Sequence, residues 1–518
     1  MLLLAHSYFL SADAKQLARM KPYPPLATML VAGLLRDNGH ALRIFDAMLA
    51  SGVDAFRAEL AAYRPTLVGI LEDNFNFLTK MCTMRMREAT LAMIAAARQQ
   101  GCRVVVNGSD SADHPQLYLD AGADAVIFGE AEMTMLEIAD IVRADAAASL
   151  SHVAGVAIRD ASGAVTRFTS RAAMRDLDLL PLPAWDLVDV NAYRHAWTTA
   201  HGRFSWNIVS SRGCPFGCNW CAKPVFGRRY SQRSPECVGE EMRRLKVEVQ
   251  PDHLWFCDDI FGLTAQWIVR FAGAVRARHA RIPFMIQCRA DLITAEVARA
   301  LSDAGAEEVG LGVESGSQRI LDAMEKGTAV DDVRQATRLL KQRGVRACWF
   351  LQLGYPGETW DDLRKTRALL HDEWPDDIGV SVAYPLPGTK FYEAVKEQLG
   401  ARHNWEDTSE LAMLFQGTYT TAFYRRIRDL FHDEVRSRIP DARPEVSLYA
   451  HRRTGPCIHA TAWPAARRVA LGHRTDHCRR RYRERAGHPV SLSARISRVA
   501  AGVRGAGGLE PFFARRSR

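Results

Sequence analysis

Short apolar runs alternate with amphipathic stretches over residues 1–145. Helix-like segments such as "TMRMREATLAMIAAARQQG" separate five runs that end at small or polar residues, as strands do. These runs are "MLLLAHS" at 1–7, "ALRIFDA" at 41–47, "LVGILED" at 67–73, "RVVVNGS" at 103–109 and "DAVIFGE" at 124–130. Strands that alternate with helices form a parallel sheet covered on both faces. The pattern therefore predicts an α/β fold that begins with a doubly wound, Rossmann-like domain.

A different pattern follows at 146–200. "GVAIRDASGAVTRF" predicts a β-hairpin whose turn is Asp160 to Gly163, and "LDLLPLPAWDLVDV" is interrupted by prolines. We expect a hairpin and a linker here, with the domain boundary between the two halves of the chain.

The strand and helix alternation resumes over 201–400. Six further runs end in charged residues or glycine, which is where βα-barrel enzymes place their chemistry. These runs are "NIVSSRG", "HLWFCDD", "FMIQCRAD", "EVGLGVESG", "ACWFLQLGYPGE" and "IGVSVAYPLPG". They predict a partial (β/α)6 barrel, and "YTTAFYRRIRDLFHDEVRSRI" predicts a closing helix within a C-terminal helical segment at 401–440.

The basic charge is confined to the end of the chain. The net charge is +9, but residues 443–518 hold 17 Arg, no Lys and 4 acidic residues, which leaves 51 basic and 55 acidic residues before them. This tail lacks sustained periodicity, so we expect 441–518 to be disordered or an aberrant end, with RNA or membrane-surface binding as the alternative. The sequence predicts no nucleic-acid partner, signal peptide or transmembrane segment, and favours a cytoplasmic location.

Eleven cysteines are scattered along the chain, and three of them cluster in "SSRGCPFGCNWCAKP" at 210–224. Cys214, Cys218 and Cys221 have a CxxxCxxC spacing on a loop whose glycines let the backbone wrap a compact inorganic cluster. Structural zinc is the alternative, but it usually takes four ligands in two separated pairs. A [4Fe-4S] cluster with three thiolates would leave one iron open to a ligand that is not protein.

The chain resembles the radical S-adenosylmethionine (SAM) superfamily, in its class with an N-terminal cobalamin-binding domain. The resemblance covers about residues 1–435 and rests on an ordered set of motifs. These are "YPPLATMLVAGLLRDNGH", "FGEAEMT", "LPLPAWDL", "SSRGCPFGCNWC", "FCDDIFG", "GLGVESGSQRILDAMEKG", "GYPGET" and "YPLPGTKFYE". It implies that the three cysteines ligate the cluster, that SAM chelates the fourth iron, and that reduction yields a 5′-deoxyadenosyl radical.

The resemblance also implies residues that bind SAM. Asp258 and Asp259 end the second barrel strand, where related enzymes hold the SAM ammonium, although one of them could instead cap a helix. Arg289 either binds the SAM carboxylate or pairs with an acid. The other candidates, for which loop structure is the alternative, are Glu314, Ser315 and Gly316 for the ribose and adenosyl group, and Gly354 in "GYPGE" for the adenine.

The cobalamin site departs from a familiar pattern. Cobalamin domains of the methionine synthase type carry DxHxxG, whose histidine ligates cobalt, whereas "FDAMLASG" offers Asp46 but has Met48 in place of the histidine. We expect cobalamin bound without a protein histidine, with an empty structural domain as the alternative. The remaining candidates for its tail lie in turns after strands: Gly108, Ser109, Gly129 and Glu130.

The reaction implied by the resemblance is cobalamin-dependent methylation of an unactivated carbon of a small molecule. One alternative is a radical reaction without methylation, such as the anaerobic oxidative cyclisation of Mg-protoporphyrin monomethyl ester. A non-catalytic iron–sulfur electron carrier is the alternative from another class, and it would need a fourth cysteine. A reducing partner such as flavodoxin or ferredoxin is expected.

Overall fold

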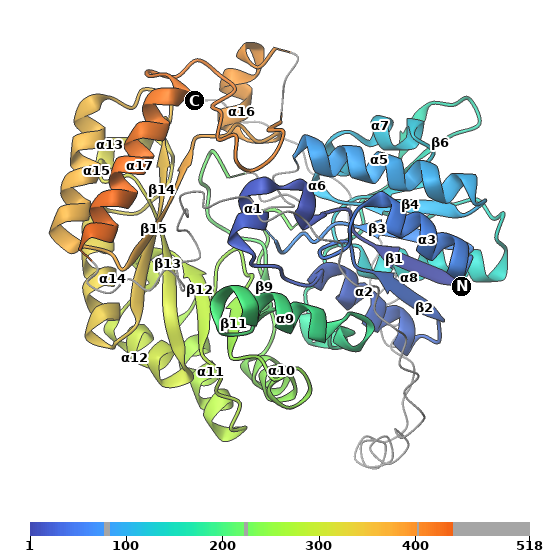
Figure 1. Ribbon diagram of the computed structural model, residues 1–518, viewed down its shortest axis with the longest axis horizontal. Helices are drawn as coiled ribbons and strands as arrows, with labels where there is room; N and C mark the ends of the chain where they lie inside the picture. Colours follow the sequence, from blue (N-terminus) through green and yellow to red (C-terminus); the bar gives the residue numbers. More distant parts are fainter. Residues whose placement is uncertain (77–82, 222–225, 401–403, 439–518) are drawn as a thin grey trace, which may run out of the picture. The chain divides into compact units, whose positions relative to one another are not determined.

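The structure, a computed structural model, describes residues 1–76, 83–221, 226–400 and 404–438. The Arg-rich tail expected at 441–518 lies outside the described residues. Two sheets organise the described chain (Figure 1). Both halves have the α/β pattern that the hydrophobic periodicity predicts.

The first sheet has the strand order β2-β1-β3-β4-β5-β6-β7, in which β1 to β5 are parallel. Its strands are β1 (Leu2–Ala5), β2 (Leu42–Phe45), β3 (Leu67–Leu71), β4 (Arg103–Asn107), β5 (Ala125–Ile127), β6 (Val156–Arg159) and β7 (Val165–Arg167). The helices of this half are α1 (Ala14–Arg19), α2 (Leu26–Asp37), α3 (Val53–Tyr63), α5 (Met84–Gln99), α6 (Ser109–Asp113), α7 (Pro115–Asp120) and α8 (Glu132–Ala144). All five predicted strands are present.

The predicted hairpin is present but belongs to the first sheet. Its strands β6 and β7 pair antiparallel with each other, and β6 also pairs antiparallel with β5. The carboxylate of Asp160 accepts the backbone N–H groups of Ser162 and Ala164 and closes the turn. The sheet thus extends to Arg167, beyond the boundary expected near residue 145.

The second sheet is a parallel half-barrel with the order β15-β14-β13-β12-β11-β8. Its strands are β8 (Ser205–Ile208), β11 (His253–Phe256), β12 (Phe284–Cys288), β13 (Ala306–Glu314), β14 (Arg346–Leu353) and β15 (Asp377–Val382), and β9 (Ser211–Arg212) pairs separately with β10 (Ser231–Gln232). The helices are α9 (Val190–His201), α10 (Pro235–Glu248), α11 (Ala265–Ala277), α12 (Ala295–Ala304), α13 (Gln318–Ala323), α14 (Val330–Gln342), α15 (Trp360–Glu373), α16 (Lys390–Val395) and α17 (Thr421–Ser437). The predicted partial (β/α)6 barrel and closing helix are confirmed.

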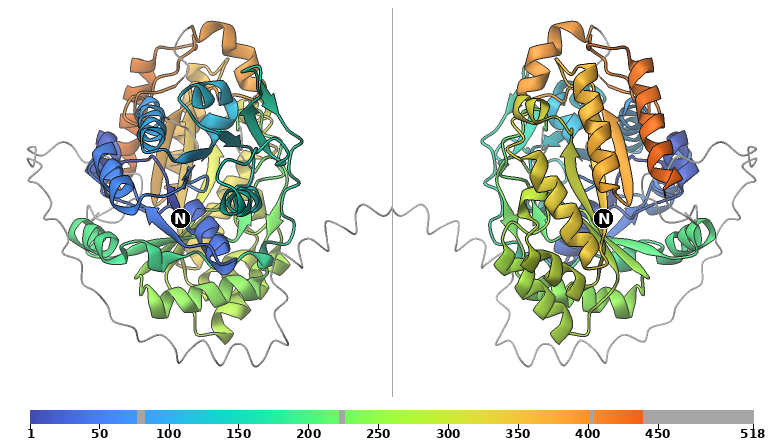
Figure 2. Two further views of the ribbon diagram at one scale, coloured as in Figure 1. Left: turned by 90° about the vertical axis from the view of Figure 1, so that its right-hand side faces the viewer. Right: turned by 90° about the vertical axis from the view of Figure 1, so that its left-hand side faces the viewer.

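Local sequence signals explain where several of these helices begin and end. Helix α10 starts with Ser234, whose hydroxyl accepts the N–H of Cys237, followed by Pro235 in the first turn. Helix α12 is capped by Thr294 and ends at Gly305, which adopts a φ of 107°. Helix α17 lies beside α15, as Figure 2 shows, and its Glu434 forms an ion pair with Arg367 of α15.

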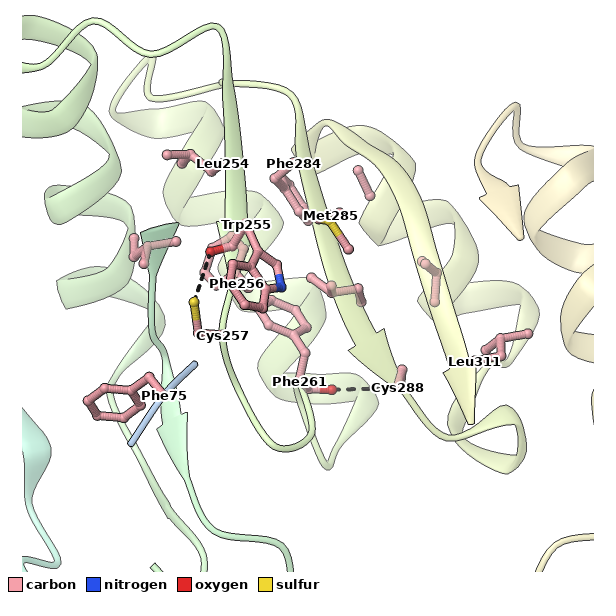
Figure 3. Packing of buried hydrophobic residues seen from close by; sticks show 14 of the residues in the cluster. Phe75, Leu254, Trp255, Phe256, Cys257, Phe261, Phe284, Met285, Cys288 and Leu311 are labelled. Carbon is pink, nitrogen blue, oxygen red and sulfur yellow. Dashed lines mark hydrogen bonds between the residues drawn. The ribbon is translucent and has the colours of Figure 1, made fainter. Parts of the chain in front are cut away.

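Aromatic residues fill the space between the half-barrel and its helices. The rings of Phe256 and Phe261 meet edge to face with centroids 4.9 Å apart, and those of Phe256 and Phe284 lie 5.3 Å apart (Figure 3). Phe271 of α11 contacts the same cluster, 5.9 Å from Phe256. Such contacts add to the hydrophobic burial of each ring.

The segment 22–25, "PYPP", anchors the first half of the chain to the second. The indole of Trp197 donates to the carbonyl of Pro22, and the amide of Asn207 donates to the carbonyl of Pro24. The hydroxyl of Tyr23 bonds to that of Ser205, and its ring packs 4.7 Å from Trp255. Pro22 and Pro24, which lack a backbone N–H, therefore contact the half-barrel through their carbonyl oxygens.

Replacing Phe256 tests the importance of this core. Phe256→Ala should lower the free energy of unfolding by about 3–5 kcal/mol, because it removes a fully buried ring and leaves a cavity. Val247→Ala in α10, where the side chain is 63% exposed, is the control and should change it by less than about 0.5 kcal/mol. Urea unfolding followed by tryptophan fluorescence measures both, and equal effects would contradict this assignment of the core.

Candidate functional site

The three predicted ligand cysteines lie on one loop after β9. Cys218 is buried, Cys214 and Cys221 are half-buried, and none of the three forms a disulfide bond. Gly213 opens the loop with a φ of 75°, and a Cβ there would lie 1.9 Å from the carbonyl oxygen of Arg229. Only glycine fits this close approach, so the loop geometry explains the glycine that precedes the first cysteine.

The described residues contain no group of three or more His, Cys, Asp or Glu that converges on a single metal ion. A cube of four irons takes its ligands at separate corners, and three thiolates on a glycine-rich loop supply three of them. The donor set and the loop thus fit a [4Fe-4S] cluster.

Asn219 fixes the loop between Cys218 and Trp220 by four hydrogen bonds. Its backbone N–H donates to Met324 over 3.0 Å and its side-chain amide to Ala323 over 2.7 Å. The N–H of Phe391 donates to its carbonyl, and the hydroxyl of Tyr355 donates to its side-chain oxygen over 2.9 Å. All of these polar groups are satisfied, which is what a rigid loop requires. Sequence reasoning did not single out Asn219.

The two acidic residues after β11 have different roles. Asp258 is buried and accepts hydrogen bonds from the N–H of Ser210 and from the hydroxyls of Ser210 and Ser211, and burial raises its pKa to about 6. Asp259 is less buried and accepts the N–H of Gly213 over 3.2 Å. Neither caps a helix, because α11 is capped by Thr264. Asp258 therefore fixes the approach to the cysteine loop, and Asp259 is the better placed of the two to bind a cation.

Glu314 lies at the end of β13, as expected, but its carboxylate is paired within the protein. Lys326 donates to it over 2.8 Å, and both side chains are buried. Burial by itself lowers the pKa of Lys326, but the negative charges of Glu314 and Cys218 raise it above its usual value. A buried cation thus lies close enough to Cys218 to interact with it electrostatically. Lys326 lies in "MEKG", at the end of one of the motifs on which the resemblance rests. Only the fold reveals that its side chain contacts Glu314.

Ser315 and Gly316 contact helix α15. The N–H of Gly316 donates to the hydroxyl of Thr366 over 2.9 Å, and a Cβ on Gly316 would lie 2.6 Å from the Cα of Thr366. The hydroxyl of Ser315 lies 3.3 Å from that of Thr366. The structure therefore favours the alternative given for these two positions, in which they are loop structure that packs a strand end against a helix.

Arg289 pairs with an acid, one of its two expected roles. Its guanidinium donates to both carboxylate oxygens of Asp291 and to the carbonyls of Lys326 and Gly327. It also lies 3.8 Å above the ring of Phe216 in the cysteine loop. Arg289 thus holds the loop and the segment around Lys326 together.

Gly354 lies at the end of β14, packed near Met413 and Tyr424, and its N–H donates to Glu358 over 2.7 Å. Glu358 is fully buried, and burial raises its pKa to about 8. The "GYPGE" turn therefore carries a carboxyl that stays protonated at neutral pH in the folded chain.

Comparisons with known proteins agree with this geometry. The profile described as the Radical SAM superfamily matches residues 208–370, and the one described as the B12 binding domain matches residues 19–139. The chain combines a B12-binding domain with a radical SAM domain. The fold agrees, since the radical SAM methyltransferase TsrM from Kitasatospora setae superposes with a TM-score of 0.63 over 82% of this chain and 84% of that one, at 19% identity.

Curated relatives cover both domains. An uncharacterised methyltransferase of Pyrococcus horikoshii is 27% identical over 74% of this chain and 81% of its own length. The hopanoid C-3 methylase of Methylococcus capsulatus is 26% identical over 73% and 70%. The anaerobic magnesium-protoporphyrin IX monomethyl ester cyclase of Rubrivivax gelatinosus is 24% identical over 73% and 67%. No helix in the described part of the chain has the length and apolar character needed to cross a membrane.

In the B12-binding domain, Asp46 is engaged within the protein. It accepts hydrogen bonds from the N–H of Met48 and from the hydroxyl of Tyr193 over 2.6 Å, and it lies 3.0 Å from Nε2 of His6. The comparison with DxHxxG finds no histidine at position 48, yet the fold brings His6, the residue after β1, beside Asp46. The signal for His6 was its place directly after a strand, at the edge where such domains bind ligands.

The ends of β1, β3 and β4 in this domain gather buried polar side chains. Among the described residues, Nδ1 of His6 and Oε2 of Glu72 are buried without a hydrogen-bond partner. Gly108 lies against the side chain of Glu72, and Ser109 is buried at the start of α6. Unsatisfied buried polar atoms are rare and fit a ligand that supplies donors and acceptors, such as the amide-rich periphery of cobalamin. This edge therefore fits the group.

Of the last two candidates, Gly129 borders open space and Glu130 does not. A Cβ on Gly129 would meet no atom within 4 Å. The carboxylate of Glu130 accepts the N–H of Met174 over 2.6 Å and a hydrogen bond from Arg212 over 3.1 Å. Gly129 is thus available to a ligand tail, whereas Glu130 joins the two domains.

Replacing Gly213 tests the loop geometry. Gly213→Ala should reduce the iron and sulfide retained after anaerobic reconstitution to a small fraction of that of the parent protein, because the Cβ collides with backbone. Gly217→Ala in the same loop is the matched control, since its Cβ would meet nothing within 4 Å. Full cluster loading of Gly213→Ala would contradict the assignment.

Glu358 should make stability depend on pH. Because its folded pKa of about 8 exceeds its model-peptide value of 4.5, the stability that it contributes is complete below pH 4.5 and is lost as the pH rises through about 8. Glu358→Gln cannot ionise, so its free energy of unfolding should fall less than that of the parent over this range, by roughly 5 kcal/mol.

Urea unfolding at a series of pH values measures the difference. Asp361→Asn on the exposed face of α15 is the control, because ion pairs lower the pKa of Asp361 and it titrates below this window. An unchanged slope for Glu358→Gln would show that Glu358 is ionised in the folded chain.

Proposed function

We propose that this protein is a radical SAM enzyme that uses a [4Fe-4S] cluster, SAM and cobalamin to methylate an unactivated carbon of a small molecule. The observation that carries the proposal is a loop of three cysteines without disulfide bonds at the carboxyl edge of the half-barrel, in one chain with a B12-binding domain. Three thiolates leave one iron of such a cluster for SAM.

Residues around the loop supply the charges that SAM requires. Asp259 accepts the ammonium of its methionine moiety, since its carboxylate is the more accessible one after β11. Lys326 supplies a positive charge beside Cys218, which offsets the negative charge gathered on the loop. When bound, the cluster and SAM supply a 5′-deoxyadenosyl radical, and cobalamin supplies a transferable methyl group.

The protein's own task is to exclude water and keep these groups in place. Two aromatic residues cover the loop. Phe216 lies under the guanidinium of Arg289, and Trp220 packs against the apolar cluster that contains Phe391. Hydrogen bonds, burial and nearby charge set the potential of an iron–sulfur cluster, and this loop has all three. A one-electron donor such as flavodoxin or ferredoxin reduces the cluster, and the cytoplasm is the compartment in which its thiolates persist.

The relatives support methylation over its alternative. Three of the proteins described above are named as methyltransferases or methylases, and one is named as a cyclase. Cyclisation of a Mg-porphyrin monomethyl ester would use the same cluster and SAM, so the product separates the two reactions. Transfer of a labelled methyl group from SAM to a product indicates methylation, and ring closure would incorporate no label.

Asp259 provides the test of the SAM site. After anaerobic reconstitution with iron, sulfide and hydroxocobalamin, the reduced protein should convert SAM to 5′-deoxyadenosine, and Cys214→Ala should abolish this. Asp259→Asn should raise the KM for SAM by roughly 10- to 100-fold, because it loses a charged hydrogen bond.

The control is Glu307→Gln, whose carboxylate pairs with Arg203 at the opposite end of the half-barrel and should not affect the KM. A KM unchanged by Asp259→Asn would remove Asp259 from the site. The absence of 5′-deoxyadenosine from the fully loaded parent protein would reject the proposed function.

A further inference from the structure

Arg212 is a buried arginine that ends β9, two residues before the first cluster cysteine. Its side chain is 3% exposed. Its backbone is fixed in register by β10, and its neighbours Ser211 and Gly213 bond to Asp258 and Asp259. Its guanidinium is therefore attached to the stretch of backbone at which the cysteine loop begins.

The guanidinium of Arg212 binds two carboxylates of the B12-binding domain. Nη1 donates to Glu130 over 3.1 Å and Nη2 to Glu132 over 2.5 Å. Both acids come from the "FGEAE" segment, in which Glu130 lies between β5 and α8 and Glu132 is the first residue of α8. An arginine is always charged in proteins, and the two carboxylates pair with that charge inside the protein.

Two aromatic rings, one from each domain, flank the same guanidinium. Phe75 follows β3 in the B12-binding domain, and Phe226 follows the cysteine loop. Each ring centroid lies 5.4 Å from Cζ of Arg212, and the two rings stack on each other 5.0 Å apart. The cation therefore contacts the ends of β3 and β5 on one side and the surroundings of the cluster on the other.

Lysine could not replace this arginine. A planar guanidinium can donate to two carboxylates and lie against aromatic rings at once, whereas an ammonium is a single, strongly hydrated point charge. Removing one partner of a buried ion pair also leaves the other charge uncompensated, which is strongly destabilising. The arrangement of Arg212, Glu130 and Glu132 is therefore rigid and intolerant of change.

We propose that Arg212 is a positioning residue that fixes the cysteine loop to the carboxyl edge of the B12-binding domain and so sets the separation between cluster and cobalamin. This inference rests on the proposed function, because it requires both cofactors in one chain. Radical enzymes that use two cofactors depend on this separation, since misplacement of reacting groups by about 1 Å can cost 100-fold in rate.

The test measures the separation in the full chain loaded with both cofactors. Cob(II)alamin and the one-electron-reduced cluster are both paramagnetic, so pulsed electron paramagnetic resonance reports their dipolar coupling. The parent protein should give one narrow distance distribution, which Arg212→Lys should broaden and Arg212→Met should broaden further. Arg233→Lys is the control, because Arg233 forms a buried pair with Glu241 inside the radical SAM domain alone.

A narrow, parental distribution in loaded Arg212→Met would overturn the inference. If that variant does not retain its cluster, the same measurement on Glu132→Gln tests the inference, because this substitution lies outside the cysteine loop. A broadened distance distribution supports the inference, and a parental one overturns it.

Failure of the proposed function is read separately on the parent protein, which would then produce no 5′-deoxyadenosine from SAM or retain no cobalamin. Without retained cobalamin, no distance between the two cofactors can be measured. In that case amide hydrogen exchange in the cofactor-free chain tests Arg212 directly. Arg212→Met should speed exchange by at least about tenfold in both 129–133 and 211–213, because these segments lose their shared buried ion pair. Faster exchange in both segments supports the inference, and unchanged exchange in either would overturn it.

Discussion

The segment Ser210–Gly213 is the constraint on which the site depends, because the cluster loop can form only if this short stretch is placed correctly. Asp258 accepts hydrogen bonds from Ser210 at the start of this segment, and Asp259 accepts the N–H of Gly213 at the end of the segment. Gly213 approaches a carbonyl so closely that no side chain fits. Three thiolates then follow on a backbone that is already fixed. The buried cation of Lys326, which also pairs with Glu314, interacts favourably with the negative charge of Cys218.

This placement links the fold to the chemistry. Parallel strands end at one edge of each sheet, and both domains present their polar residues at that edge. The half-barrel edge holds the cysteines, Asp259 and the pair of Glu314 with Lys326. The edge of the B12-binding domain holds buried polar atoms of His6 and Glu72 that have no hydrogen-bond partner within the described chain. A chain that carries both edges can bind a radical source and a methyl donor, and radical methylation requires both.

The sequence predicted the helices and strands and the loop that carries the three cysteines, but not the pairings between distant residues. The strands of both sheets and the cysteine loop follow from local periodicity and spacing, which are visible along the chain. Glu314 pairs with Lys326, 12 residues away, and Asp46 lies beside His6, 40 residues away. No local sequence pattern revealed either pairing. Gly316 illustrates the same limit. A glycine at a strand end suggested room for a cofactor, whereas the structure shows that it makes room for a helix.

The central claim is that three cysteines hold a cluster whose fourth iron is open to SAM. The most direct measurement is the electron paramagnetic resonance spectrum of the reduced cluster, recorded on the same sample before and after addition of SAM. The account predicts that SAM shifts the principal g values, because a new ligand binds one iron, and that the shift vanishes in Asp259→Asn at low SAM concentration. A spectrum unchanged by saturating SAM would mean that no iron of the cluster is open, and would contradict the account.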